Sequence, residues 1–279
     1  MKDTPNIFST ANPWNLVANG YARTIARVLG QYAEEAVALA KLRRGFAVLD
    51  VACGPGTLSL MVAKKVSRVA AIDFSPKMVA IFRKRLREKA IRHVKVYQGD
   101  GQALPFERDS FDAAFSMFGL MFFPDRPQGF AELYRTLKPG GRAVVSSWAP
   151  VSRSPAMQAM FGALRAMDPT MPEPRKAIKS LEDPNVFKNE MSGAGFTGVR
   201  IIPVRKPFPT TSVKKYWTIM TEGSAPVVLM RKKLGEQTWK AREKIGLEYL
   251  SKHWPIFSGR LSSDAWLGIG TKPLKRRSS

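Results

Sequence analysis

The 279-residue sequence has few cysteines, few histidines and few acidic side chains. Its single cysteine, Cys53, excludes a disulfide framework and a zinc site built on a cysteine cluster, and it favours a reducing compartment. We therefore expect no metal centre. Only His93 and His253 offer an imidazole as a general base, so few residues could support a mechanism that depends on histidine.

Long apolar runs are also missing. The amino-terminal residues contain no apolar core of the kind found in a secretory signal, and no later run approaches the ~20 apolar residues of a membrane span. These absences predict a soluble, cytoplasmic protein.

Basic residues outnumber acidic ones by 45 to 22, which gives a formal net charge of +23. Such an excess creates a positive field that attracts RNA, anionic lipid or an anionic substrate. A peripheral position on an anionic membrane surface is therefore one alternative. The plainer alternative is a set of solvated helix faces. The basic residues concentrate in 77–95, 214–215, 231–244 and 275–277.

Residues 46–60 form the stretch around which the chain is organised. Residues 46–51 are an apolar, β-branched run typical of a strand buried in a parallel sheet. Gly54 and Gly56 then allow a sharp turn that exposes backbone N–H groups at the start of a helix. Asp50 lies near the carboxyl end of this strand, where open α/β sheets bind their ligands.

A second predicted strand, residues 68–73, ends in Asp73, which is placed to accept hydrogen bonds from the hydroxyls of a ribose. The turn and this acid together indicate a nucleoside-containing cofactor. A dinucleotide is disfavoured, because its fingerprint needs a third glycine where this chain has Ser59.

Four segments follow one another in a recognisable order and spacing: Val48-Leu-Asp-Val-Ala-Cys-Gly-Pro-Gly-Thr57, Ala71-Ile-Asp-Phe-Ser-Pro-Lys-Met78, Gly99-Asp-Gly-Gln-Ala-Leu-Pro-Phe106 and Leu137-Lys-Pro-Gly-Gly141. Together they resemble the class I S-adenosylmethionine-dependent methyltransferases, in the small-molecule branch that includes the ubiquinone and menaquinone methyltransferases. The resemblance covers residues 30–150 well and the rest poorly. One departure is Ala52, where the family often has glycine.

The resemblance implies S-adenosyl-L-methionine as cofactor and S-adenosyl-L-homocysteine as product. It assigns the ribose to Asp73, the adenine amino group to Asp100 and the adenine face to Met78. The full set of expected cofactor-binding positions is Asp50, Ala52, Cys53, Gly54, Gly56, Asp73, Phe74, Met78, Asp100, Gly101, Gln102, Ser116 and Met117.

The implied fold is an α/β, Rossmann-like sheet of seven mostly parallel strands with an antiparallel last strand, helices on both faces and a helical cap. Further strands are expected at 94–98, 111–116, 142–148, 199–204 and 265–270, and helical periodicity starts near Tyr21. We expect residues 1–32 to form a lid, 33–210 and 255–279 to form the cofactor domain, and 211–254 to form the cap as two or three helices. Residues 156–167 are expected to join that cap.

On the acceptor side, Trp14, Tyr21, Trp148 and His253 are the candidates, and no catalytic residue is certain. Residues 117–123 are apolar where nucleic-acid amino-methyltransferases carry Asn/Asp-Pro-Pro-Tyr/Phe, which favours a small or lipid-like acceptor over nucleic acid. An RNA methyltransferase that uses the basic surface and a non-catalytic cofactor-binding protein remain alternatives. The acceptor, the atom methylated and the oligomeric state stay open.

Overall fold

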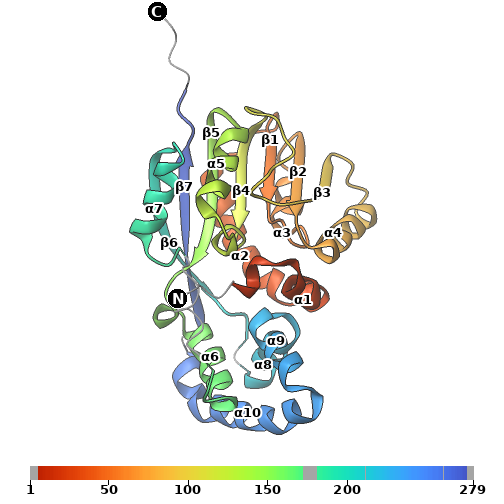
Figure 1. Ribbon diagram of the computed structural model, residues 1–279, viewed down its shortest axis with the longest axis vertical. Coiled ribbons are helices and arrows are strands. Elements are labelled where there is room, and N and C mark those ends of the chain that lie inside the picture. The colour runs from red at the N-terminus through yellow and green to blue at the C-terminus, as the bar shows by residue number, and fades with distance from the viewer. Residues whose placement is uncertain (1–5, 172–180, 211, 260, 275–279) are drawn as a thin grey trace, which may run out of the picture.

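The computed structural model describes residues 6–171, 181–210, 212–259 and 261–274. Its centre is one seven-stranded sheet in the order β3-β2-β1-β4-β5-β7-β6 (Figure 1). Neighbouring strands from β3 to β5 are parallel, whereas β7 is antiparallel to both β5 and β6. This confirms the predicted fold class. The strands are β1 (Ala47–Val51), β2 (Arg68–Asp73), β3 (Val94–Gln98), β4 (Phe111–Met117), β5 (Leu137–Trp148), β6 (Thr197–Pro207) and β7 (Ser262–Thr271).

The central strands form because apolar residues cover both of their faces. All five residues of β1 are buried, as are nine of the ten in β7. Successive residues of β1 point into different cores, with Val48 on one side of the sheet and Leu49 on the other. The last three strands run beyond their predicted bounds. Strand β5 begins five residues early, where Leu137 pairs with Phe111 of β4, and pairing between β6 and β7 lengthens both of those strands.

Helices cover both faces of the sheet. On the Val48 side lie α2 (Ile25–Ala40), α3 (Thr57–Val62) and α4 (Pro76–Glu88), and on the Leu49 side lie α5 (Arg126–Thr136) and α7 (Pro184–Gly193). Helix α4 begins where Ser75 caps the backbone N–H of Met78 and Pro76 takes the first helical position. On the apolar side of this helix, Met78 and Phe82 are buried.

Helix α1 (Ala11–Arg23) begins ten residues before the predicted start of helical periodicity near Tyr21. The polar residues 11–20 gave no clear helical pattern, yet Pro13 in the first turn costs no backbone hydrogen bond. Packing against α4, α8 and α9 stabilises this helix. A short 3-10 helix, η1 (Ile7–Ser9), precedes it, and η2 (Leu120–Phe122) and η3 (Val151–Arg153) lie later in the chain.

Four further helices form a lobe below the sheet in Figure 1: α6 (Pro155–Met167), α8 (Val213–Gly223), α9 (Ala225–Leu234) and α10 (Glu236–Ser258). The lobe has its own core, in which Leu164, Tyr216 and Trp239 are buried. The segment between β6 and β7 thus contains three helices, and α10 runs four residues past the expected end of the cap at 254. No helix in the described ranges combines the length and apolar character needed to cross a bilayer.

Candidate functional site

The turn after β1 holds its unusual shape through three residues with positive φ. Ala52 has φ of 56°, Gly54 of 53° and Gly56 of 84°. A Cβ on Gly54 would meet no atom within 4 Å, so the backbone here is open to a ligand. A Cβ on Gly56 would lie 2.2 Å from the Phe82 ring, so this glycine instead allows α4 to pack closely on the turn.

Asp73, at the end of β2, holds this turn with its side chain. Its Oδ2 accepts a hydrogen bond from the backbone N–H of Gly54 at 2.8 Å, and its Oδ1 accepts one from that of Ser75 at 2.9 Å. Burial raises the pKa of Asp73 to about 6, against the lowering effect of these two bonds. Each oxygen keeps a second lone pair for a ligand hydroxyl.

A cavity of about 240 Å³ lies over this turn, at the carboxyl ends of β1 to β4. Its lining brings together many of the predicted cofactor positions from the ends of four strands, and the most distant of them, Ala52 and Met117, are 65 residues apart in the chain. These are Ala52, Gly54, Asp73, Phe74, Met78, Asp100, Gly101, Gln102 and Met117, and Tyr21 of α1 joins them.

Four predicted positions, Asp50, Cys53, Gly56 and Ser116, do not line the cavity. Asp50 accepts a hydrogen bond from Ser59 Oγ at 2.6 Å, and burial raises the pKa of this carboxyl to about 7. Burial also raises the pKa of the Cys53 thiol, which keeps it protonated. Ser116 Oγ accepts a hydrogen bond from the backbone N–H of Leu120 at 3.2 Å. In the structure these four residues lie outside the cavity lining, next to the turn or at the end of β4.

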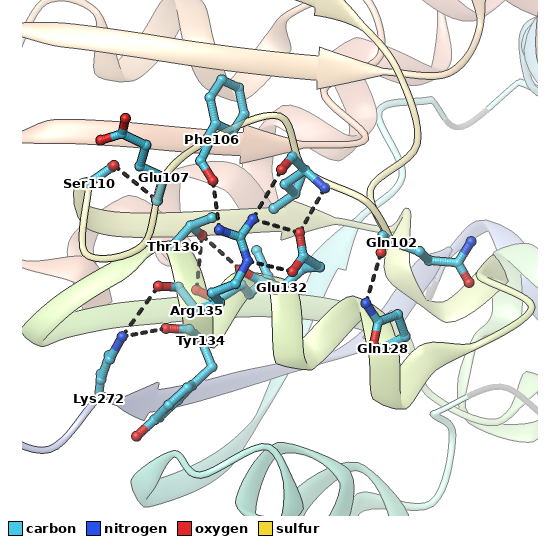
Figure 2. A network of polar contacts seen from close by, with 12 residues as sticks. Gln102, Phe106, Glu107, Ser110, Gln128, Glu132, Tyr134, Arg135, Thr136 and Lys272 are labelled. Carbon is cyan, nitrogen blue, oxygen red and sulfur yellow. Dashed lines mark hydrogen bonds and ion pairs between the residues drawn. The ribbon is translucent and has the colours of Figure 1, made fainter.

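The loop that carries Asp100 and Gln102 is braced by helix α5 (Figure 2). Gln128 Nε2 donates to the carbonyl of Gln102 at 3.1 Å. The carboxylate of Glu132 accepts the backbone N–H of Leu104 at 2.7 Å, and Arg135 donates to the carbonyls of Leu104 and Phe106. This brace was not predicted, because its only local signal in the sequence is the spacing of Glu132 and Arg135 on one helix face.

The buried end of Lys272 completes the same network. Its Nζ donates to the carbonyls of Tyr134 at 2.9 Å and Leu137 at 2.7 Å, and it pairs with Asp109 at 2.7 Å. Figure 2 shows this ammonium group at the end of α5, where free carbonyls favour a cation. Lys272, the residue after β7, thus holds the end of the helix that braces the cavity loop.

A second cavity, of about 190 Å³, adjoins the first. Helices α1, α2, α6 and α8 and the start of α9 supply most of its wall, with Trp148 at the end of β5. Its described lining contains no charged side chain. Besides Trp148 and the residues shared with the first cavity, the lining includes Val28, Met121, Met157, Met160, Phe161, Phe208, Met220 and Ser224.

Five aromatic residues line both cavities: Phe8, Trp14, Tyr21, Phe118 and Phe122. The rings of Trp14 and Phe122 lie 5.3 Å apart, and Trp14 Nε1 donates to the carbonyl of Phe8 at 2.9 Å. Burial and the negative charge of Asp73 both raise the pKa of Tyr21, so its hydroxyl stays protonated. We call these five residues the aromatic partition.

The predicted acceptor-side residues have different surroundings. Tyr21 and Trp14 belong to the aromatic partition, and Trp148 lines the second cavity only. His253 lines neither cavity, because its ring stacks on Tyr249 at 4.2 Å and its Nδ1 lies 2.7 Å from the Tyr249 carbonyl. Phe118 and Phe122 lie in the apolar segment 117–123, from which a small or lipid-like acceptor was predicted. Phe8 was not among the predicted site residues, since a single apolar residue near the amino terminus carries no signal of a ligand.

A doubly wound sheet with a glycine turn and a carboxylate at the end of the next strand defines a nucleoside-binding α/β domain. A family model described as a methyltransferase domain matches residues 48–141. The demethylmenaquinone methyltransferase of Listeria welshimeri is 36% identical over 115 residues, which cover 40% of this chain and 49% of that protein. The chain thus spans about half the length of this relative.

A longer match is to the demethylmenaquinone methyltransferase of Thermus thermophilus, 30% identical over 187 residues that cover 60% of this chain and 81% of that one. Among solved structures, the YcgJ protein of Bacillus subtilis has a TM-score of 0.56 at 21% identity and covers 88% of this chain and 98% of its own. The chain belongs to the class I S-adenosylmethionine-dependent methyltransferases and is similar to their menaquinone-biosynthesis branch.

Proposed function

We propose that this protein transfers a methyl group from S-adenosylmethionine in the first cavity to an uncharged, apolar acceptor in the second. The observation that carries the proposal is the aromatic partition, because its five side chains line both cavities and so bring the two sites side by side. A methyl group passing between two ligands needs such adjacent sites.

The first cavity fits the cofactor by its shape and its chemistry. The open backbone at Gly54 admits a ligand, and the buried carboxylate of Asp73 has lone pairs for ribose hydroxyls. Met78 is 2% exposed and gives a polarizable wall for the adenine ring. Asp100 accepts hydrogen bonds from the backbone and side chain of Gln102, which fixes its carboxylate for the adenine amino group.

When bound, the cofactor supplies an activated methyl group, so the protein needs no covalent nucleophile. The residues of the chain orient the acceptor toward the methyl group of the cofactor and exclude water. Orientation of two bound reactants alone lowers a barrier by up to ~7–11 kcal/mol. The aromatic partition keeps the transfer region dry, and Tyr21, which stays protonated, is a hydrogen-bond donor there.

The lining of the second cavity decides which acceptors suit it. Its described residues include no Asp, Glu, His, Lys or Arg, so neither a counter-ion for a charged acceptor nor a strong general base is present. An acceptor that is uncharged and already nucleophilic near neutral pH fits such a site. The names of the Listeria and Thermus relatives support a ring of the quinone type, which we propose as a lipid-like acceptor.

In this proposal, residues 1–32 act as a lid and 211–254 as a cap, both placed over the acceptor. Of their described parts, η1, α1, the start of α2, α8 and α9 contribute to the wall of the second cavity. Residues 1–5 and 211 lie outside the described ranges. The basic tail 275–277 also lies outside them. The cytoplasm is the proposed compartment.

An anionic membrane surface is the proposed source of a lipid-like acceptor. Helix α4 has five cationic side chains and one acidic one, and the neighbouring α9 has three cationic and no acidic side chains. Both helices pack against α1, the helix that walls the two cavities. Cations in such numbers attract anionic headgroups.

The test is a transfer assay with methyl-labelled S-adenosylmethionine and three acceptors: reduced demethylmenaquinone with a short side chain, phosphoethanolamine and total RNA. We expect label in the first acceptor only, and S-adenosylhomocysteine in the mass spectrum of the purified protein. Label in RNA would instead support the basic-surface alternative, and label in phosphoethanolamine would contradict the uncharged acceptor. Cofactor binding without transfer to any acceptor would contradict the methyltransferase proposal.

A further inference from the structure

The helix α1 is fastened at its first turns to the start of α4. Asn15 Oδ1 accepts a hydrogen bond from Ser75 Oγ at 2.7 Å and a longer one from the backbone N–H of Lys77 at 3.3 Å. Ser75 is fully buried and caps α4 by accepting from the backbone N–H of Met78 at 3.2 Å. The Asn15 side chain therefore serves the cap residue of a neighbouring helix, not its own helix.

This contact continues to the proposed ribose site. The backbone N–H of Ser75 donates to Asp73 Oδ1, and the other carboxylate oxygen accepts from Gly54 in the cofactor turn. Hydrogen bonds therefore run from α1 through Ser75 to Asp73 and Gly54 without a break. Asp73 and Gly54 both line the first cavity.

A second contact fastens the other end of α1 to the same turn. Arg85 of α4 donates from Nη1 to the carbonyl of Pro55 at 3.0 Å and from Nη2 to the carbonyl of Ala22 at 2.8 Å. Pro55 lies between the two glycines of the cofactor turn, and Ala22 is near the end of α1. One planar guanidinium thus joins the turn to the helix.

The opposite side of α1 packs against helix α8 of the lobe. A Cβ on Gly20 would lie 1.8 Å from the carbonyl oxygen of Glu222, so the backbones of α1 and α8 are in direct contact. Next to these two attachment points, α1 presents Trp14 and Tyr21 to both cavities. A shift of this helix would therefore alter both cavities together.

We propose that Asn15 and Arg85 are positioning residues that fix α1 to the cofactor turn, so that filling the first cavity tightens the second. The inference rests on the proposed function, in which the two cavities hold cofactor and acceptor. A ligand that binds Asp73 and the turn restrains Ser75 and Pro55, the residues to which α1 is attached. Helix α1 is then held in one position, and its Trp14 and Tyr21 side chains complete the wall of the acceptor cavity. Because coupling between two binding sites is reciprocal, an acceptor-site ligand must tighten cofactor binding by the same factor.

The experiment uses S-adenosylhomocysteine for the first cavity and the neutral fluorophore N-phenyl-1-naphthylamine for the second. The fluorophore's affinity is measured by its emission with and without saturating S-adenosylhomocysteine, and the reverse titration is made by calorimetry. We expect saturation to raise the fluorophore's affinity at least about fivefold in the natural protein. Asn15→Ala and Arg85→Met should lower this ratio to near one.

The chain offers matched controls on the same two helices. Asn12 and Asn19 are exposed on α1, and Arg87 is exposed on α4. Asn12→Ala, Asn19→Ala and Arg87→Met should leave the ratio unchanged. Asn15→Asp keeps an acceptor oxygen for Ser75 and Lys77 at the start of α4, so it should restore the coupling.

Thermal unfolding of each variant separates positioning from a merely structural role. If Asn15→Ala and Arg85→Met lower the melting temperature but keep the natural ratio, the inference is wrong. A ratio near one in the natural protein would also overturn it, while leaving the proposed function in place. Trp148→Ala checks that the fluorophore occupies the second cavity. Competition between the two ligands, or no binding of S-adenosylhomocysteine at all, would instead contradict the proposed function.

Discussion

Ala52 and Phe118, at the ends of the neighbouring strands β1 and β4, both have left-handed backbones, with φ of 56° and 55°. This conformation costs a residue with a Cβ ~1–2 kcal/mol. Both residues line the first cavity. The backbone N–H of Phe118 donates to Ser146 Oγ at 2.8 Å and its ring lies 4.2 Å from that of Trp148, so the surroundings hold the strained turn in place.

The first prediction concerns the backbone strain at Ala52 and its close contact with Gly119. A Cβ on Gly119 would lie 2.2 Å from the Cβ of Ala52, so Gly119→Ala should destabilise the protein by about 1–3 kcal/mol. Ala52→Gly removes that obstacle and the left-handed penalty, and we expect it to stabilise by about 1 kcal/mol. Urea unfolding of both single variants and the double variant measures these effects.

The double variant gives the sharper result. If the two Cβ atoms are what collide, Gly119→Ala should cost much less in the Ala52→Gly background than alone. Equal costs in both backgrounds would show that another neighbour, such as Ser116 Oγ at 3.4 Å from the added Cβ, is responsible.

A second prediction concerns Asp73 and pH. Asp73→Asn removes a charged acceptor and should weaken S-adenosylhomocysteine binding by about 1–3 kcal/mol, roughly 5- to 150-fold. The natural protein should lose affinity as pH falls through about 6, because protonation neutralises the same carboxylate. Calorimetry across this range should show a falling affinity in the natural protein and a flat profile in the variant.

A natural profile as flat as that of the variant would mean that Asp73 does not bind the ligand in its charged form. Circular dichroism checks that the variant is folded. This control is needed because asparagine has only one oxygen, so its NH2 group would face the backbone N–H of either Gly54 or Ser75, and both of these groups are donors.

The sheet and the glycine turn could be predicted because their signals are local. The apolar run before Asp50 and the glycines after it fix a strand and a turn within ten residues. Asp73 could be placed near the glycine turn because parallel strands bring their ends to one edge, whereas Met117 was assigned to the same cavity through the family resemblance.

The second cavity depends on contacts that no local pattern encodes. The aromatic partition joins Phe8 near the amino terminus to Phe122 after β4, and α8 closes the wall with Met220. Likewise, nothing around Asn15 indicates that it bonds Ser75, 60 residues later. Periodicity shows that a residue lies on a helix but not which distant residue it meets.

Trp148 and His253 provide a third prediction, because both were expected on the acceptor side and only Trp148 lines the second cavity. Trp148→Ala removes an aromatic contact, so the acceptor KM should rise about 2- to 10-fold. The affinity for S-adenosylhomocysteine should change less, because Trp148 reaches the first cavity only through its contact with Phe118. His253→Ala should leave both constants unchanged. Steady-state kinetics with the acceptor found in the transfer assay measures them, and a loss of kcat in His253→Ala would contradict the placement of this residue.

The fourth prediction follows from the buried carboxyl of Asp50. Burial raises its pKa to about 7, whereas an unfolded aspartate has a pKa of about 3.9. Between these values the folded state binds more protons than the unfolded state, so the free energy of unfolding falls as pH rises from about 4 to about 7. The contribution of Asp50 to this slope approaches 1.4 kcal/mol per pH unit at most.

Asp50→Asn tests that contribution, because the amide stays neutral and its oxygen still accepts from Ser59 Oγ. Urea unfolding at about pH 5 and about pH 8 should show a smaller loss of stability in the variant than in the natural protein, with a net gain in stability at the higher pH. The matched control is Glu34→Gln, at an exposed position on α2, which should keep the natural slope. If Asp50→Asn kept it too, the carboxyl of Asp50 would have to be ionised throughout this range, and its burial would be compensated by the hydrogen bond from Ser59.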